Sequence, residues 1–256
     1  MSLGMNTATG GFVCHKCQVR GKLPEDLLDL VPYEAMDPGE KPEDITITMP
    51  EGFYPLFEEP GVSAQFLDPY RGYILGRAIS EQSGFDVQIG AVTGGWYAGR
   101  VVIPHWDWAN DKLVGWVART VFGGGDKPKY LYPKGMHRDL MWGEDALQRE
   151  TDEPALIVEG CFDALPYWPE AIACLGKPRL SHIPAILAAK RPVAIVLDGD
   201  AWEEGWALAM KLNFMAQAAE LTVRVGCVRL ASGEDPGALA EGGRGAELMA
   251  RARESV

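Results

Sequence analysis

Cysteine is scarce in this chain of 256 residues, which has five, at positions 14, 17, 161, 174 and 227. An odd number, with three of the five inside apolar segments, is not typical of a secreted protein built on disulfides. The first residues also lack a basic start followed by an apolar stretch, so no secretory signal is expected. We therefore expect a reduced, cytoplasmic protein.

Long apolar runs are absent as well, because Gly, Pro or charged residues interrupt every one of them. A membrane-spanning helix needs about 20 consecutive apolar residues, so no span and no membrane partner are expected. The content of 47% hydrophobic and 23% charged residues is typical of a globular protein. The length suits one large domain, or two smaller ones that share a cleft.

Positive charge is in the minority, and the net charge of −12 argues at first against a nucleic-acid partner. The charges are unevenly distributed, however. Residues 34–59 contain eight acidic residues and one lysine, whereas residues 100–140 contain seven basic residues and four acidic ones. The middle of this acidic chain is therefore basic, and it is the part suited to bind phosphates.

Composition divides the chain into four parts. Residues 1–33 hold a Cys pair and a short helical candidate, and residues 34–60 read as an acidic, Pro-rich linker. In residues 61–152 a helical pattern covers 70–80, and short apolar segments then alternate with Gly-rich turns. Two of these segments, 99–104 and 113–117, predict paired strands around a turn at Asn110-Asp111.

Residues 153–256 alternate between short apolar strands and helical stretches. Strands are predicted at 155–159, 171–175, 193–197 and 223–230, with the clearest helix at 202–220. This alternation predicts a mostly parallel sheet with crossover helices. In that helix Trp202, Trp206 and Met210 recur at helical spacing, which predicts that they pack in the core.

Three acidic residues follow two of these strands: Glu159 comes after the first, and Asp198 and Asp200 come after the third. Ligands of an open α/β sheet bind beyond the carboxyl ends of its strands, so these side chains should share one rim. Carboxylates that repel one another suit a cation, and a set of oxygen ligands favours Mg²⁺ or Mn²⁺ over zinc. The alternative is that they are turn residues or helix caps.

These segments resemble the Toprim motifs of bacterial primases. Ala155–Leu165, which contains Glu159-Gly160, is similar to the first motif, and Val196–Ala201 with Gly205 is similar to the second. Ser232–Pro236 resembles the segment that follows the last core strand in that family. Toprim domains also occur in topoisomerases, recombination mediators and nucleases, so this resemblance implies a metal site but no particular reaction.

The preceding half of the chain resembles the basic subdomain of DnaG-type primases. The similarity lies in Gly99–Pro104, in Gly115–Arg119, in Lys127–Leu131 and in Tyr70-Arg71-Gly72 with Ile89-Gly90. In that family this subdomain binds the template and the incoming nucleotide. The residues that the resemblance assigns to this task are Arg100, Arg119, Lys127, Lys129 and Tyr130.

The resemblance to a DnaG-type bacterial or phage primase core implies an α/β fold: a Toprim-type, mostly parallel sheet with helices on both faces, preceded by a smaller basic α+β subdomain. It implies Mg²⁺- or Mn²⁺-dependent synthesis of RNA primers on single-stranded DNA in a bacterium or a phage-infected host. Nucleoside triphosphates and a replicative helicase would be further partners. The implied catalytic residues are Glu159, Asp198 and Asp200, with Asp163 and Asp235 as further metal ligands. A Toprim nuclease and a non-catalytic nucleic-acid-binding protein remain the alternatives.

The sequence departs from the family at two places. Family members often carry an acidic residue two positions after the aspartate that matches Asp235, and here that residue is Gly237. At the N-terminus, Cys14 and Cys17 resemble half of the zinc-binding module of primases. A closed zinc site needs four ligands, and no Cys or His precedes Cys14, so we expect no complete zinc site in this chain.

Overall fold

The computed structural model describes residues 3–5, 11–14, 20–22, 46–57, 65–107, 110–122, 128–137 and 139–256, with only the backbone given up to residue 22. The chain divides into two units, Met1–Ile45 and Thr46–Val256. Residues 46–57 thus belong to the second unit, although their composition suggested the linker. The other domain boundaries stay predictions.

The first unit contains a small antiparallel sheet of three strands, β1 (Leu3–Met5), β2 (Gly11–Cys14) and β3 (Arg20–Lys22). Cys14 is the last residue of β2, whereas Cys17 and the helical candidate near residues 24–30 lie outside the described residues. The predicted half of a zinc module is therefore not tested here.

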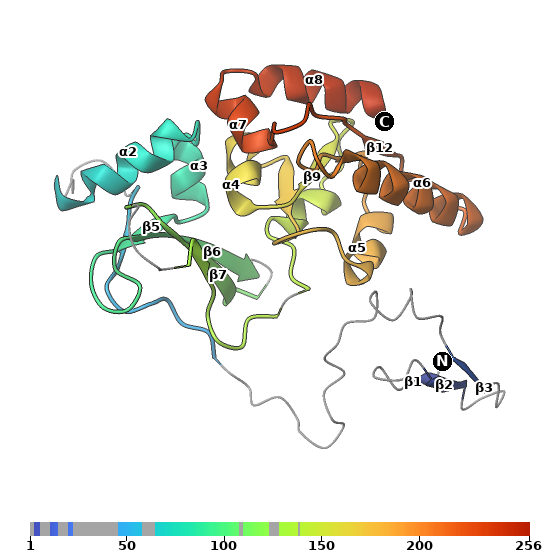
Figure 1. The fold of residues 1–256 in the computed structure, drawn as a ribbon, viewed down its shortest axis with the longest axis horizontal. Coiled ribbons are helices and arrows are strands. Elements are labelled where there is room, and N and C mark those ends of the chain that lie inside the picture. Colours follow the sequence, from blue (N-terminus) through green and yellow to red (C-terminus); the bar gives the residue numbers. More distant parts are fainter. Residues whose placement is uncertain are drawn as a thin grey trace. The chain divides into compact units, whose positions relative to one another are not determined.

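The second unit begins with an antiparallel sheet of five strands in the order β4-β5-β6-β7-β8 (Figure 1). Its two long strands form the hairpin that the sequence predicted, with Arg100 opposite Thr120 at one end and Asp107 opposite Lys112 at the other. The strands are β4 (Phe53–Pro55), β5 (Gly90–Val92), β6 (Arg100–Asp107), β7 (Lys112–Thr120) and β8 (Tyr130–Leu131).

Two helices accompany this sheet where the sequence suggested one. Helix α2 (Asp68–Gly76) follows a 3₁₀ turn at Gln65–Leu67 and ends before Ala78, whose φ of +56° is incompatible with a continued helix. Helix α3 (Glu81–Asp86) then starts from Ser80, whose side chain accepts a hydrogen bond from the Ser83 amide. The N-cap at Ser80 starts a separate helix, whereas the periodic pattern of apolar residues predicted a single one.

The remaining chain forms a parallel sheet of four strands in the order β10-β9-β11-β12, as predicted. Its strands are β9 (Ala155–Val158), β10 (Ala171–Ala173), β11 (Val193–Ile195) and β12 (Val225–Cys227). The α-helices are α4 (Cys161–Ala164), α5 (Ile183–Leu187), α6 (Trp202–Ala218), α7 (Pro236–Glu241) and α8 (Gly245–Ser255), and short 3₁₀ helices lie at Glu144–Gln148, Leu165–Tyr167 and Leu180–His182. The mixed α/β class is confirmed.

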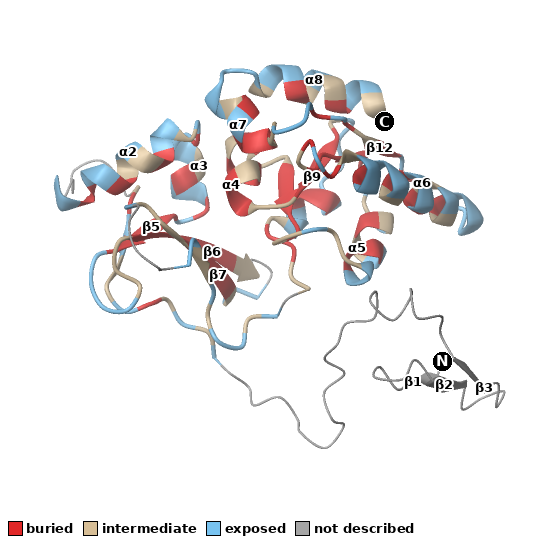
Figure 2. Cartoon of the chain, viewed as in Figure 1, coloured by how far each residue is buried: buried red, intermediate tan, exposed pale blue. Residues whose placement is uncertain are grey.

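Alternate residues of the parallel strands enter two different cores. On β9, Leu156 and Val158 pack with residues of α4, α7 and α8, whereas Ala155 and Ile157 pack with residues of α5 and α6. Helices therefore cover both faces of the sheet, which explains why β9, β10 and β11 are buried along their whole length, as Figure 2 shows for β9. The first core also contains Val101 and Ile103 of β6, so it connects the two sheets.

Helix α6 corrects one expectation. Trp206 and Met210 are 54% and 47% exposed, and Phe214, one turn further, is 72% exposed. The residues that α6 buries form a different stripe of mostly small side chains, Gly205, Ala209, Leu212 and Ala216. Both stripes have helical spacing, and the smaller side chains pack on the sheet because they allow the helix to approach it. Within the described residues, no helix combines the length and the apolar character that crossing a bilayer requires.

Candidate functional site

The strand ends of the parallel sheet bring four acidic residues together. Glu159 directly follows β9, and Asp198 lies three residues beyond β11, the parallel neighbour of β9. Asp163 lies in α4, which starts just after Glu159. Asp235 precedes α7 and caps it by accepting a hydrogen bond of 2.6 Å from the Ala238 amide. All four residues line one cavity of about 490 Å³.

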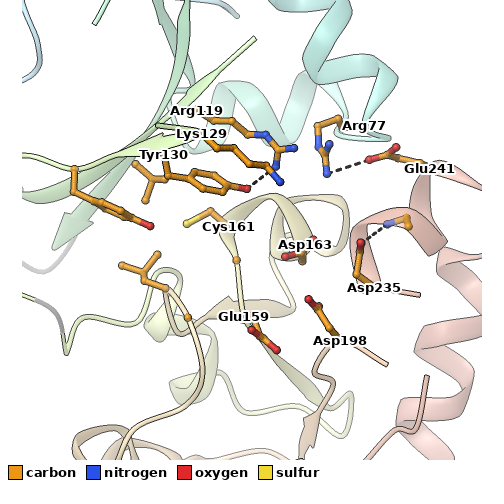
Figure 3. Close-up of a pocket in the computed structure, with 16 residues that line it drawn as sticks. Arg77, Arg119, Lys129, Tyr130, Glu159, Cys161, Asp163, Asp198, Asp235 and Glu241 are labelled. Atoms are coloured by element: carbon orange, nitrogen blue, oxygen red, sulfur yellow. Dashed lines mark hydrogen bonds and ion pairs between the residues drawn. The ribbon is translucent and has the colours of Figure 1, made fainter. Parts of the chain in front are cut away.

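The cavity has walls of opposite charge, which belong to the two sheets. Figure 3 shows Arg119, Lys129 and Tyr130 of the antiparallel sheet on one side and Glu159 and Asp198 of the parallel sheet on the other. The structure thus brings together seven of the residues that the sequence proposed. These are Glu159, Asp163, Asp198, Asp235, Arg119, Lys129 and Tyr130.

Asp163 lies between two glycines that leave room for its carboxylate. A Cβ atom on Gly160 would come within 2.7 Å of its Oδ2, and one on Gly237 within 2.8 Å of its Oδ1. An acidic side chain at position 237 would therefore need this carboxylate to move. Gly237 and the present position of Asp163 fit each other.

Mutual repulsion and burial weaken the acidity of two of these carboxyls. Burial, followed by the charges of Asp235 and Asp198, raises the pKa of Asp163 to about 7. Burial, followed by the charges of Glu159, Asp235 and Asp200, raises the pKa of Asp198 to about 6. Bringing these acids together without a cation costs folding free energy, because each charge disfavours the others.

One carboxylate oxygen of Asp198 has no hydrogen-bond partner in the described structure. This atom, Oδ1, is buried. The backbone beside it is tightly fitted, because a Cβ on Gly199 would lie 1.8 Å from the carbonyl oxygen of Ala231. A buried carboxylate oxygen without a partner is costly, and a bound cation would relieve that cost.

The donor set fits a divalent cation of the Mg²⁺ type, since it consists of carboxylate oxygens. In the part of the chain that the structure describes, however, no three His, Cys, Asp or Glu side chains are close enough to hold a metal ion as they stand. The carboxylates share a cavity but do not form a finished cage. Glu159 and Asp198 line the cavity from the ends of neighbouring strands, so their carboxylates could hold a divalent cation there.

The basic wall is stabilised by aromatic rings. The Arg119 guanidinium donates a hydrogen bond of 2.5 Å to the Tyr130 hydroxyl and lies 4.7 Å from the centre of the Phe162 ring. The Lys129 ammonium lies 5.5 Å from the ring centre of Tyr130. These contacts position both cations next to the cavity and leave donors free for a ligand.

Two of the proposed residues, Arg100 and Asp200, do not line the cavity, and a third lies outside the described residues. Arg100 does not line the cavity: it is 2% exposed, and its guanidinium donates hydrogen bonds to the carbonyl oxygens of Ala118, Pro128 and Lys129. Asp200 is exposed, lies outside the cavity lining and affects Asp198 only through its charge. Lys127 lies outside the described residues.

The structure adds three charged residues that the sequence did not reveal, Arg77 and Glu241 in the cavity lining and Lys177 beside it. Arg77 follows α2 and lines the cavity, where its Nη2 lies 3.1 Å from Oε1 of Glu241 in α7. No periodic pattern marks either residue. Lys177 follows β10 on the rim of Glu159 and binds Glu204 at 2.6 Å, and the strand-end rule that found the acids could have found it.

Comparison with solved structures identifies the class of fold. The chain is similar to the primase of Aquifex aeolicus, in a structure of its zinc-binding and RNA polymerase domains, with a TM-score of 0.58 and 20% identity over 73% of this chain and 55% of that one. It is similar to a DnaG primase catalytic domain bound to single-stranded DNA, with a TM-score of 0.57 and 21% identity over 73% of this chain and 74% of that one. The E. coli primase catalytic core gives 0.55 and 21%, over 74% of each chain.

The predicted resemblance is confirmed at the level of the fold: the chain folds like the catalytic core of a DnaG-type primase. It spans about half the length of the Aquifex aeolicus chain. No protein-family model matches the sequence, and no curated protein matches it significantly.

Proposed function

We propose that this chain is a primase core that joins ribonucleotides on a single-stranded DNA template. The observation that carries the proposal is the cavity in which Glu159 and Asp198 face Arg119 and Lys129 on a primase-like fold. Polymerising nucleotides requires cations for the triphosphate and acids for metal and proton, and both are present within one cavity.

In this proposal the basic wall binds the incoming nucleotide. Arg119 and Lys129 would hold its triphosphate, since both present charged N–H donors next to the cavity. Tyr130 keeps Arg119 in place through their hydrogen bond. Arg77 would add a third cation once its contact with Glu241 opens.

The acidic wall would act on the other reactant. Glu159 would act beside the attacking 3′-hydroxyl, either as a metal ligand or as the base that accepts its proton, because it lies at the strand end with Gly160 beside it. Glu159 and Asp198 would hold Mg²⁺ or Mn²⁺, with Asp163 and Asp235 as further ligands; a bound ion would neutralise the charge that develops on the phosphates. These assignments make the site a Toprim-type centre.

The test is incorporation of labelled nucleoside triphosphates by the full chain on a mixed single-stranded DNA template, with Mg²⁺ or Mn²⁺. We expect short RNA products from the wild type and none from Glu159→Gln. Metal-dependent shortening of labelled DNA without incorporation would identify a Toprim nuclease instead. Template binding with neither reaction would identify a non-catalytic binding protein.

A further inference from the structure

A second cavity, of about 310 Å³, shares no lining residue with the acidic cavity. It lies at the far end of the β6–β7 hairpin, where Trp106, Asp107 and Val114 meet the segment 140–148 and Trp168. A cavity of this volume accommodates a ligand about the size of a long side chain.

Tryptophan rings form one wall of this cavity. The rings of Trp142 and Trp168 lie 5.1 Å apart at 51°, and Trp106 adds a third. Trp142 is held firmly, since its Nε1 donates a hydrogen bond of 2.8 Å to the Pro104 carbonyl and its backbone pairs with Ala173. The aromatic wall is therefore in place before any ligand binds.

A glycine places acidic groups directly beside this wall. Gly143 has a φ of +77°, and a Cβ there would lie 3.0 Å from the carbonyl oxygen of Ala171 and 3.4 Å from Cζ3 of Trp168. Glycine thus lets the chain turn tightly against the indole. The next two residues, Glu144 and Asp145, also line the cavity.

The charge of the cavity is entirely negative. Asp107, Glu144 and Asp145 line it, and its lining contains no Lys or Arg among the described residues. Asp107 is engaged by Asn110, whereas Glu144 and Asp145 have no hydrogen bond or ion pair with any residue that the structure describes. Both side chains remain exposed to solvent, so a cation can reach them, and partial burial with the charge of Asp145 raises the pKa of Glu144.

A buried histidine completes the lining. His105 is 8% exposed, and its Nδ1 has no hydrogen-bond partner. Burial lowers the pKa of His105 to about 4, so the ring is neutral at pH 7 and does not repel a cation. His105 thus contributes to the lining a neutral ring with one buried nitrogen whose hydrogen-bonding capacity is unused.

We propose that this cavity binds an ammonium or guanidinium group carried on a short apolar stem. The stem would lie on the half-buried Trp168, whose ring packs against Trp142, and the charge would lie between Glu144 and Asp145. Two sources share this chemistry, an arginine or lysine side chain of a partner protein and a free polyamine.

Calorimetric titration of the full chain with two cations tests the proposal and separates these sources. The probes are N-acetylarginine amide, which represents a protein side chain, and spermidine, with N-acetylcitrulline amide as the uncharged analogue of the first. The double variant Glu144→Gln/Asp145→Asn removes the charge. Its matched control, Glu150→Gln/Asp152→Asn, changes exposed acids of the same region that do not line the cavity.

We expect saturable binding of at least one cation, weakened about tenfold or more in the double variant and unchanged in the control. Tighter binding of the arginine probe would identify a protein side chain as the occupant, and tighter binding of spermidine a polyamine. Three results would overturn the proposal. The first is no saturable binding of either cation up to about 10 mM, and the second is equal affinity of the double variant and the wild type for the cation that binds. The third is an arginine probe that binds no more tightly than its uncharged citrulline analogue although both bind.

Discussion

Glu241 of α7 reaches across the acidic cavity to Arg77, with its Oε1 3.1 Å from Nη2 of the arginine. Arg77 belongs to the part of the unit that holds the antiparallel sheet, and Glu241 to the part that holds the parallel one. Glu241 thus neutralises Arg77, a cation that the proposed nucleotide site could use. The ion pair connects the two parts of the unit on either side of the cavity.

From this pair we predict that Glu241→Gln strengthens triphosphate binding by about threefold to tenfold, because phosphate no longer competes with a carboxylate for Arg77. Fluorescence titration with a labelled nucleoside triphosphate measures the affinity. Glu254→Gln, an exposed acid outside the cavity, is the control and should not change it. An unchanged or weaker affinity in Glu241→Gln would show that the ion pair does not restrict the site.

A second prediction concerns acid and stability without metal. The pKa of Asp163 is about 7 in the folded chain and near 4 in the unfolded one, so only the folded state takes up this proton between these values. Folding stability should therefore increase as the pH falls from 8 to 5.5, and the pKa of Asp198, about 6, adds to the trend.

Thermal melts of the metal-free chain across this range measure the effect. Asp163→Asn should melt higher at pH 8, by about 2–4 °C for each kcal/mol of repulsion relieved, and should flatten the pH dependence. Asp152→Asn, which changes an exposed acid outside the cavity, should follow the wild type. A wild-type melting temperature that falls steadily from pH 8 to 5.5 would contradict the prediction.

The third prediction separates chemistry from folding at the strand ends. Asp198→Asn and Glu159→Gln should each abolish nucleotide transfer while the metal-free fold stays intact or becomes slightly more stable, because one repelling charge is lost. Activity and melting temperature are measured on the same preparations. A fall of more than about 5 °C in metal-free Asp198→Asn would mean that this side chain is structural instead.

Two lysines provide the fourth prediction. Lys129 lines the cavity and Lys134, five residues later, is exposed and does not. Lys129→Ala should weaken triphosphate binding about tenfold, the loss expected for one charge-assisted contact, and Lys134→Ala should have a smaller effect. Titration of both variants decides the matter, and equal affinity of Lys129→Ala and the wild type would count against the primase proposal.

The fifth prediction follows from the unexpected position of Arg100. Its guanidinium connects the carbonyl oxygens of Ala118, Pro128 and Lys129, so it holds the chain around Lys129 against β7. Arg100→Met should lower the free energy of unfolding by about 1–3 kcal/mol, because the buried bond to Ala118 and the bond to Pro128 are lost, whereas the Lys129 carbonyl keeps the Thr120 amide as a donor. Urea denaturation measures this loss, whereas Arg119→Met should reduce stability less. Equal stability of Arg100→Met and wild type would refute the structural role.

The acidic wall could be predicted because it depends on local information. A short apolar run followed by an acid marks the end of a buried strand, and parallel neighbours bring such ends to one rim, which is how Glu159 and Asp198 were found. Asp200, only two residues after Asp198, lies just before α6 and does not line the cavity. The direction of single residues in a turn depends on contacts such as the tight approach of Gly199 to Ala231.

The basic wall could be predicted only in part, since burial of a cation depends on distant partners. Arg100 and Arg119 both lie in largely apolar strands, β6 and β7, and sequence alone does not distinguish them. Arg100 is buried because carbonyls from β7 and from residues 128 and 129 surround it, whereas Arg119 lies between aromatic rings beside the cavity. The sequence did not predict that Arg77 lines the cavity, because Arg77 follows the end of α2, where no pattern of apolar residues indicates the direction of a side chain.

The uncovered stripe of α6 limits the conditions under which this protein can be handled. With a net charge of −12 the molecules repel one another at neutral pH, which keeps Trp206, Met210 and Phe214 of different molecules apart. At the isoelectric point, near pH 4.8, that repulsion is gone and exposed apolar rings promote precipitation. Acidification from pH 8 to 5.5 should therefore make each metal-free molecule more resistant to unfolding, whereas a further fall toward the isoelectric point should make the solution less stable as a colloid.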